Sequence, residues 1–164
     1  MMAGMALSMA AQLAALDTEH AALYRANADR TALRLQSLAD ECRRTGESLK
    51  GRSIVTQHSI FDYLARDLGL TVEAHIQPHE GQEPSARGML ELVRLIRAKN
   101  VGAIAVEPQY PDRTGRTLAA ETGIPCITLD PAANGPDAIP HPLAWYENVM
   151  RGNLRTLEQN LGTR

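Results

Sequence analysis

The feature that most constrains the fold is a regular alternation of short strands and helices that begins at Gly51. Four short β-rich segments recur, and a helical segment follows each of them. The expected strands span residues 53–56, 71–76, 103–106 and 126–129, and the expected helices span residues 61–68, 84–99, 112–123 and 143–161. Strands that alternate with helices in this way form a parallel sheet with helices on both faces.

The composition of the strands predicts their order in the sheet. The first, third and fourth segments are apolar throughout, which is typical of strands buried on both faces. The second, Thr71–Ile76, alternates apolar and polar residues, as an edge strand does. With right-handed crossovers the order is 2-1-3-4. We therefore expect an α/β fold of three layers, a four-stranded parallel sheet flanked by helices.

A long helix is expected before this sheet. Asp17 is a suitable N-cap, and apolar or small residues recur every three or four positions from Thr18 to Glu47. The opposite face of this helix carries most of its arginines and aspartates. The predicted division is an amino-terminal helical segment, residues 1–50, which includes the long helix, and an α/β lobe, residues 51–164.

The bulk composition excludes several classes of protein. The chain has 164 residues, 44% of them hydrophobic, with a formal net charge of -2 and no long basic run. This charge argues against nucleic acid or an anionic membrane as the main partner. The apolar start has no basic n-region, so a signal peptide is not expected within it. Cys42 and Cys126 make no metal-binding spacing, and a disulfide between them is not expected.

Polar side chains stand at the carboxyl ends of three expected strands. His58 follows the first strand, Glu107 the third and Asp130 the fourth. In the order 2-1-3-4 the chain reverses direction between the first and third strands, which opens a crevice at this edge. Glu107 and Asp130 both precede a proline, which favours an extended backbone. One imidazole with carboxylates suits a divalent ion such as Zn²⁺ or Mn²⁺.

Other interpretations of these residues remain open. Each could be a polar residue that caps a neighbouring helix. Glu107 and Asp130 could be the acid–base pair of a small hydrolase, although no substrate-orienting motif accompanies them. Ser59 beside His58 does not make a catalytic triad, and no glycine-rich phosphate loop follows any strand. The remaining polar candidates are expected to be solvated: His20, His75, His79, His141, Arg113 and Arg116.

Four segments together resemble a known family. V-T-Q-H-S-I-F-D-Y-L-A-R-D-L-G-L, Q-E-P-S-A-R, I-A-V-E-P-Q-Y and I-T-L-D-P, in this order, are similar to the carboxyl-terminal lobe of zinc- and manganese-type substrate-binding proteins of ABC transporters. The upstream D-T-E-H-A-A-L-Y-R-A-N-A-D-R is similar to the helix that links the two lobes in that family. The resemblance extends from about Asp17 to Leu161.

The resemblance implies a function and a site. Family members hold a metal ion between two lobes with four side chains, and the two from this lobe fall on His58 and Asp130. Glu107 would lie beside the site. A histidine at position 58 favours zinc over manganese as the cargo. The implied protein is not an enzyme, delivers metal to an ABC transporter permease, and is periplasmic or extracellular.

The sequence also departs from the family. The amino-terminal lobe, which supplies two further ligands, has no counterpart in these residues. Two ligands alone predict weak metal binding. The long helix, without that lobe, would expose an apolar stripe and favour self-association. The alternative function is therefore a truncated interaction or dimerisation module that does not bind metal.

Overall fold

The computed structural model describes residues 2–79, 81–135 and 143–162. The chain divides into two compact units, Met1–Cys42 and Arg43–Arg164. The first unit is helical, and the second contains the sheet. The division at residue 50 that the sequence suggested remains a prediction.

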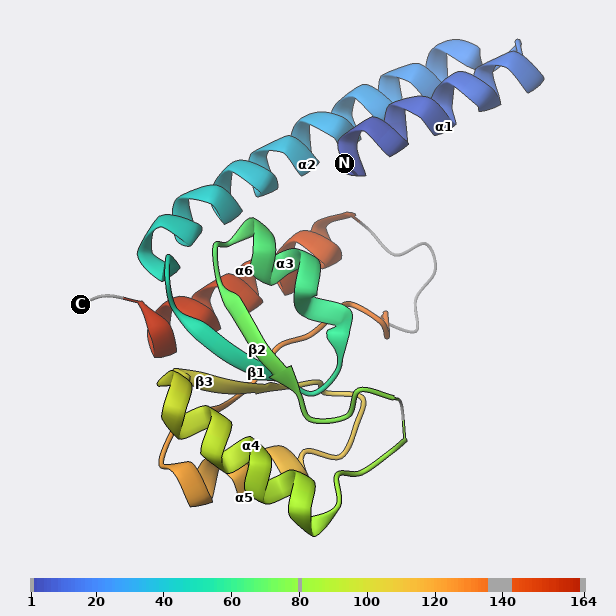
Figure 1. Cartoon of the computed structure of the whole chain (residues 1–164). Helices are drawn as coiled ribbons and strands as arrows, with labels where there is room; N and C mark the ends of the chain where they lie inside the picture. The colour runs from blue at the N-terminus through green and yellow to red at the C-terminus, as the bar shows by residue number, and fades with distance from the viewer. Residues whose placement is uncertain (1, 80, 136–142, 163–164) are drawn as a thin grey trace. The chain divides into compact units, whose positions relative to one another are not determined.

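The first unit contains helix α1 (Met2–Leu16) and the first part of helix α2 (Ala21–Leu49), which run side by side (Figure 1). Alanines on both helices are buried, among them Ala10, Ala14 and Ala28. Asp17 occupies the corner between the helices, and its carboxylate accepts a hydrogen bond from the backbone N–H of His20 at 3.2 Å. The predicted cap at Asp17 is thus present, although α2 begins three residues later than expected.

The second unit is built on a four-stranded sheet. Strands β1 (Ser53–Thr56), β2 (Thr71–His75), β3 (Ala103–Val106) and β4 (Cys126–Thr128) pair in the order β2-β1-β3-β4. All three pairings are parallel. Every residue of β3 is buried, whereas β2 is partly exposed along its length. The predicted order and the predicted edge strand are therefore confirmed.

Helices cover both faces of this sheet (Figure 1). Helices α4 (Ala86–Lys99) and α5 (Arg113–Thr122) lie on one face, and α3 (Asp62–Asp67) and α6 (Leu143–Leu161) lie on the other. Branched side chains fill the space beneath α4 and α5 because β1 and β3 present apolar residues on both faces. This core contains Val55, Ile76, Ile96, Val101, Ile104, Val106 and Leu118. The three-layer α/β fold is confirmed.

Two helix starts differ from the sequence prediction. The helix expected from residue 61 begins at Asp62, because residues Ser59–Phe61 form a 3₁₀ turn. Pro84 is not the first residue of α4, because the hydroxyl of Ser85 accepts a hydrogen bond from the N–H of Gly88 at 3.2 Å and caps the helix. Both helices therefore begin one or two residues later than the sequence pattern predicts, after a turn in one case and a capping side chain in the other.

The helix ends agree better with expectation. Gly69 and Gly123 follow α3 and α5 with φ of 69° and 75°, the left-handed conformation that glycine adopts at low cost. Cys42 and Cys126 are not joined by a disulfide. None of the helices in the described ranges combines the length and apolar character that crossing a bilayer requires.

Candidate metal centre

His58 and Glu107 meet at the carboxyl edge of the sheet. The parallel ladder of β1 and β3 continues one step beyond the strands, since the N–H of Gln57 donates to the carbonyl of Ala105 at 2.8 Å. This register brings the Nδ1 of His58 to 2.7 Å from Oε1 of Glu107. Glu107 is only 2% exposed, whereas the His58 side chain is 14% exposed. The two residues form a pair with the imidazole on the solvent side.

The surroundings of Glu107 determine which nitrogen of His58 can bind a metal. The other carboxylate oxygen, Oε2, accepts a hydrogen bond from the side-chain amide of Gln109 at 2.7 Å. A carboxylate only accepts hydrogen bonds, so the Nδ1 of His58 carries the proton in this pair. Nε2 is then the nitrogen that can coordinate a metal, an arrangement common among metal-binding histidines.

Nε2 of His58 faces a second chain of polar groups. Oε1 of Gln77, the second residue after β2, lies 2.9 Å from it. The amide nitrogen of Gln77 donates to Oε1 of Glu83 at 2.7 Å, and Oε2 of Glu83 accepts from the hydroxyl of Thr114 at 2.7 Å. The loop after β2 is therefore fastened both to His58 and to the start of α5.

Two further residues fix the shape of this edge. Gln57 is 3% exposed, and its side-chain oxygen accepts from the N–H of Glu107 at 3.1 Å while its amide donates to the carbonyl of Pro111. The ring of Tyr110 packs edge-on against the imidazole of His58, with the centroids 4.7 Å apart. These contacts restrict rotation of the imidazole.

Asp130 follows β4, and hydrogen bonds with Asn153 hold its backbone in place. The side-chain oxygen of Asn153 on α6 accepts from the N–H of Asp130 at 2.8 Å, and its amide donates to the carbonyl of Asp130 at 2.7 Å. One carboxylate oxygen of Asp130 accepts from the N–H of Ala132 at 2.8 Å. Within the described residues, Asp130 makes no hydrogen bond or ion pair with His58 or Glu107.

The structure thus pairs two of the three predicted residues directly. In residues 2–79, 81–135 and 143–162, no three His, Cys, Asp or Glu side chains converge on one metal position. The assignment of His58 and Asp130 as ligands, with Glu107 beside them, remains a prediction. Sequence reasoning missed Gln57, Gln77 and Asn153, although the first two lie within two residues of a strand end and the third is a polar residue on the buried face of α6.

The weaker candidates are elsewhere. His20 and His79 are exposed, as expected, and His141 lies outside the described residues. His75 is not simply solvated, which corrects the prediction. Its Nδ1 lies 2.8 Å from the hydroxyl of Thr56, and its Nε2 lies 3.6 Å from a carboxylate oxygen of Asp62. The side chain of His75 is 26% exposed.

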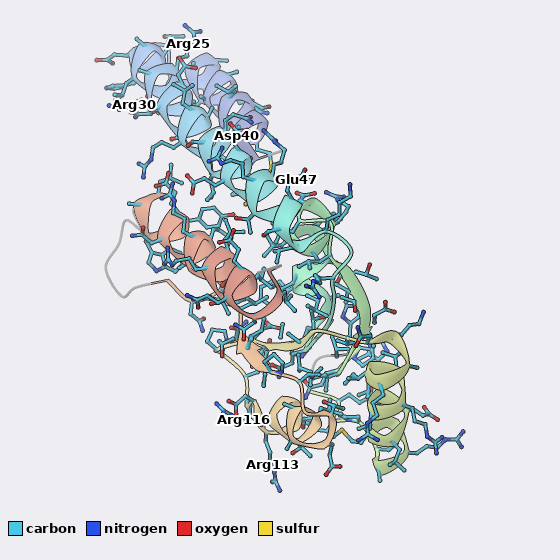
Figure 2. The ribbon with its side chains drawn as sticks, turned by 90° about the vertical axis from the view of Figure 1, so that its left-hand side faces the viewer. Arg25, Arg30, Asp40, Glu47, Arg113 and Arg116 are labelled. Atoms are coloured by element: carbon cyan, nitrogen blue, oxygen red, sulfur yellow. The ribbon has the colours of Figure 1, made fainter. Side chains whose placement is uncertain are left out.

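The two arginines at the start of α5 are exposed. Figure 2 shows that the side chains of Arg113 and Arg116 extend outward from the helix. Arg116 donates to a carboxylate oxygen of Asp112 at 2.6 Å, so this aspartate, at the N-cap position, pairs with a side chain instead of capping the backbone. This supports the prediction of a solvated helix face.

Comparison with known proteins identifies the family of this chain. The family model described as zinc-uptake complex component A, periplasmic, matches residues 1–160. The high-affinity zinc uptake system protein ZnuA of Bacillus subtilis is 27% identical over 94% of this chain and 48% of its own length. The zinc-binding lipoprotein AdcA of Streptococcus pneumoniae is 31% identical over 77% of this chain and 25% of its own length.

Solved structures agree with these relatives. The substrate-binding protein FpvC of Pseudomonas aeruginosa in complex with Ni²⁺ has a TM-score of 0.80 at 27% identity, covering 96% of this chain and 59% of that one. The same protein with Mn²⁺ gives a TM-score of 0.79. The chain spans between a quarter and about half of the length of the curated relatives named above. With its three-layer lobe and a match over nearly every residue, the chain belongs to the periplasmic zinc-uptake component A family of metal-binding ABC-transporter proteins.

Proposed function

We propose that this chain binds a divalent metal ion, zinc in preference to manganese, as one lobe of a solute-binding protein for ABC-type metal uptake. The observation that carries the proposal is the pairing of His58 with Glu107. A buried carboxylate that holds Nδ1 orients the imidazole and leaves Nε2 as the nitrogen that can bind a metal ion. His58 is the first proposed ligand, and Glu107 is its positioning partner.

Asp130 is the second proposed ligand. Asn153 fixes its backbone on both sides, and only one of its carboxylate oxygens receives a described hydrogen bond, from Ala132. The other oxygen is chemically suited to zinc or manganese. Because zinc sites commonly have four ligands, groups outside this pair must complete the coordination.

Capture and release, without covalent chemistry, is the proposed mechanism, and an ABC transporter permease is the proposed recipient. Family members are periplasmic or extracellular lipoproteins, and we propose the same location for this chain. The hydrolase alternative is weakened by the surroundings of Glu107, since both its oxygens accept hydrogen bonds from His58 and Gln109. That carboxylate is engaged as an anchor and is poorly placed to take a proton from a substrate.

The alternative of a non-metal interaction module is not favoured. The family is one of zinc-binding proteins, and a buried carboxylate that holds Nδ1 of a histidine is an arrangement common among metal-binding histidines. Self-association through α2 remains a prediction. Leu23 and Leu33 on that helix are exposed, at 55% and 72%.

Zinc titration by calorimetry tests the proposal. His58→Ala should abolish or severely weaken zinc binding without loss of the fold, because the ring is on the rim of the sheet. His79→Ala removes an exposed histidine and should leave the affinity unchanged. Equal affinities for the wild type and His58→Ala would refute the site.

Asp130→Asn tests the second ligand. The asparagine side-chain oxygen can still accept the hydrogen bond from Ala132, so the turn should survive. The loss of the negative charge should lower zinc affinity by about tenfold or more. An unchanged affinity, with an unchanged circular dichroism spectrum, would remove Asp130 from the site.

A further inference from the structure

The side chain of Gln77 lies where a metal on His58 would bind. Its Oε1 is 2.9 Å from Nε2 of His58, the nitrogen left over once Nδ1 is engaged by Glu107. Gln77 is 6% exposed, so this contact belongs to the interior of the loop and is sheltered from solvent. Nothing in the family resemblance pointed to this residue.

Glu83 determines which end of the carboxamide faces His58. The amide nitrogen of Gln77 donates to Oε1 of Glu83, and a carboxylate can accept but not donate. The other oxygen of Glu83 is held by the hydroxyl of Thr114. The oxygen end of Gln77 is thereby turned towards the imidazole.

This arrangement sets the carboxamide oxygen against Nε2 of the imidazole at hydrogen-bond distance. A ligand nitrogen gives up its proton on metal binding, and a divalent ion in the place of that proton would contact both atoms at once. We propose that Gln77 is a further metal ligand of this chain, through Oε1, beside Nε2 of His58.

The type of donor atom indicates which metal Gln77 would favour. Amide oxygens suit manganese better than zinc. Gln77 should therefore contribute more to Mn²⁺ affinity than to Zn²⁺ affinity.

The inference rests on the proposed function and is tested by calorimetric titration of the full chain with Mn²⁺ and with Zn²⁺. Gln77→Ala should weaken Mn²⁺ binding by about tenfold or more and Zn²⁺ binding by less. Gln77→Met keeps the length of the side chain but removes the oxygen, and should behave in the same way if the oxygen is a ligand. Gln82→Ala removes an exposed carboxamide from the same loop and should change neither affinity.

The outcomes separate this inference from the proposed function. Metal binding that is lost in His58→Ala but is equal in the wild type, Gln77→Ala and Gln77→Met would overturn the role of Gln77 and leave the metal function intact. Tighter binding in both Gln77 variants would show that Gln77 competes with the metal, which also overturns it. No metal binding by the wild type would overturn both.

Discussion

His58 has two ring nitrogens in different surroundings, and the proposed chemistry depends on that difference. Nδ1 contacts a buried carboxylate, and Nε2 contacts the oxygen of a carboxamide. A histidine placed simply to fill space at a strand end would not need both contacts. The division of roles between the nitrogens explains how one residue can be held rigidly and still present a donor atom to a metal.

Glu107→Gln tests the positioning role at the scale of one residue. The substitution keeps the shape but removes the charge, and one of the two donors, His58 or Gln109, would then face an amide N–H. We expect a loss of about 1–3 kcal/mol in the free energy of unfolding. Zinc affinity should fall about 10–100-fold.

Urea denaturation and zinc calorimetry on the same variant measure these two effects. Gln109→Ala offers a milder comparison, since it removes only one hydrogen bond from Oε2 of Glu107. A Glu107→Gln protein that binds zinc as tightly as the wild type would show that Glu107 does not position His58.

At the scale of an element, helix α6 supports the candidate metal site because its Asn153 holds the backbone of Asp130. Asn153 is 4% exposed and forms two hydrogen bonds to the backbone of Asp130. Asn153→Ala would leave the partly buried N–H and carbonyl of Asp130 without these partners. We expect it to cost about 1–3 kcal/mol in the free energy of unfolding and to weaken zinc binding.

A matched substitution on the same helix gives the control. Asn160 is exposed and donates only to the carbonyl of Thr156 within the helix. Asn160→Ala should change the unfolding free energy by less than about 0.5 kcal/mol. Equal unfolding free energies for the two variants would contradict the role given to Asn153.

The hydrogen bond between Tyr24 and Asp17, at the corner between α1 and α2, predicts that the stability of the first unit depends on pH. The hydrogen bond from the hydroxyl of Tyr24 at 2.9 Å, with the further contacts from His20, lowers the pKa of Asp17, and the same bond raises the pKa of Tyr24. A carboxyl whose pKa is lowered on folding stabilises the fold above its unfolded pKa, about 3.9, and loses that contribution as the pH falls through the folded value. Tyr24→Phe should raise the pKa of Asp17 towards its ordinary value.

Carbon-13 NMR titration of the Asp17 carboxyl measures this shift. In Tyr24→Phe the first unit should also begin to unfold at a higher pH during acidification. Tyr63→Phe, which changes an exposed tyrosine on α3, should leave the Asp17 titration unchanged. The same Asp17 pKa in Tyr24→Phe and the wild type would show that the hydroxyl does not act on it.

The elements were largely predictable because their signals are local. The apolar run Ala103–Val106 predicted β3 to the residue, and the alternation in β2 predicted its edge position. Helix starts were less predictable, because Ser59, Pro84 and Ser85 offer competing caps close to the helices that they precede. Which cap forms depends on the turn that the rest of the fold imposes.

The site was only partly predictable for a different reason. His58 and Glu107 could be placed together because parallel strands end at one edge. Gln77 and Asn153 act through contacts between residues 19 and 23 positions apart in the sequence, and no spacing in the sequence marks them. Histidine is the commonest metal ligand, so it draws attention in a sequence in a way that glutamine and asparagine do not.

At the scale of the whole molecule, family membership and site chemistry point the same way. The family match extends over residues 1–160, so α1 belongs to the family as well as the α/β lobe, beyond the stretch from Asp17 that the motifs indicated. The relative AdcA is named as a zinc-binding lipoprotein, and the similar structures of FpvC contain Ni²⁺ or Mn²⁺. The central claim for this chain is that Nε2 of His58 is a metal ligand.

Nitrogen-15 NMR of the histidine rings during zinc titration tests that claim most directly. We predict that Nε2 of His58 shifts on zinc addition while Nδ1 keeps its proton, and that His20 and His79 do not change at the same zinc concentration. Shifts of equal size at the exposed histidines, or no shift at His58, would contradict it.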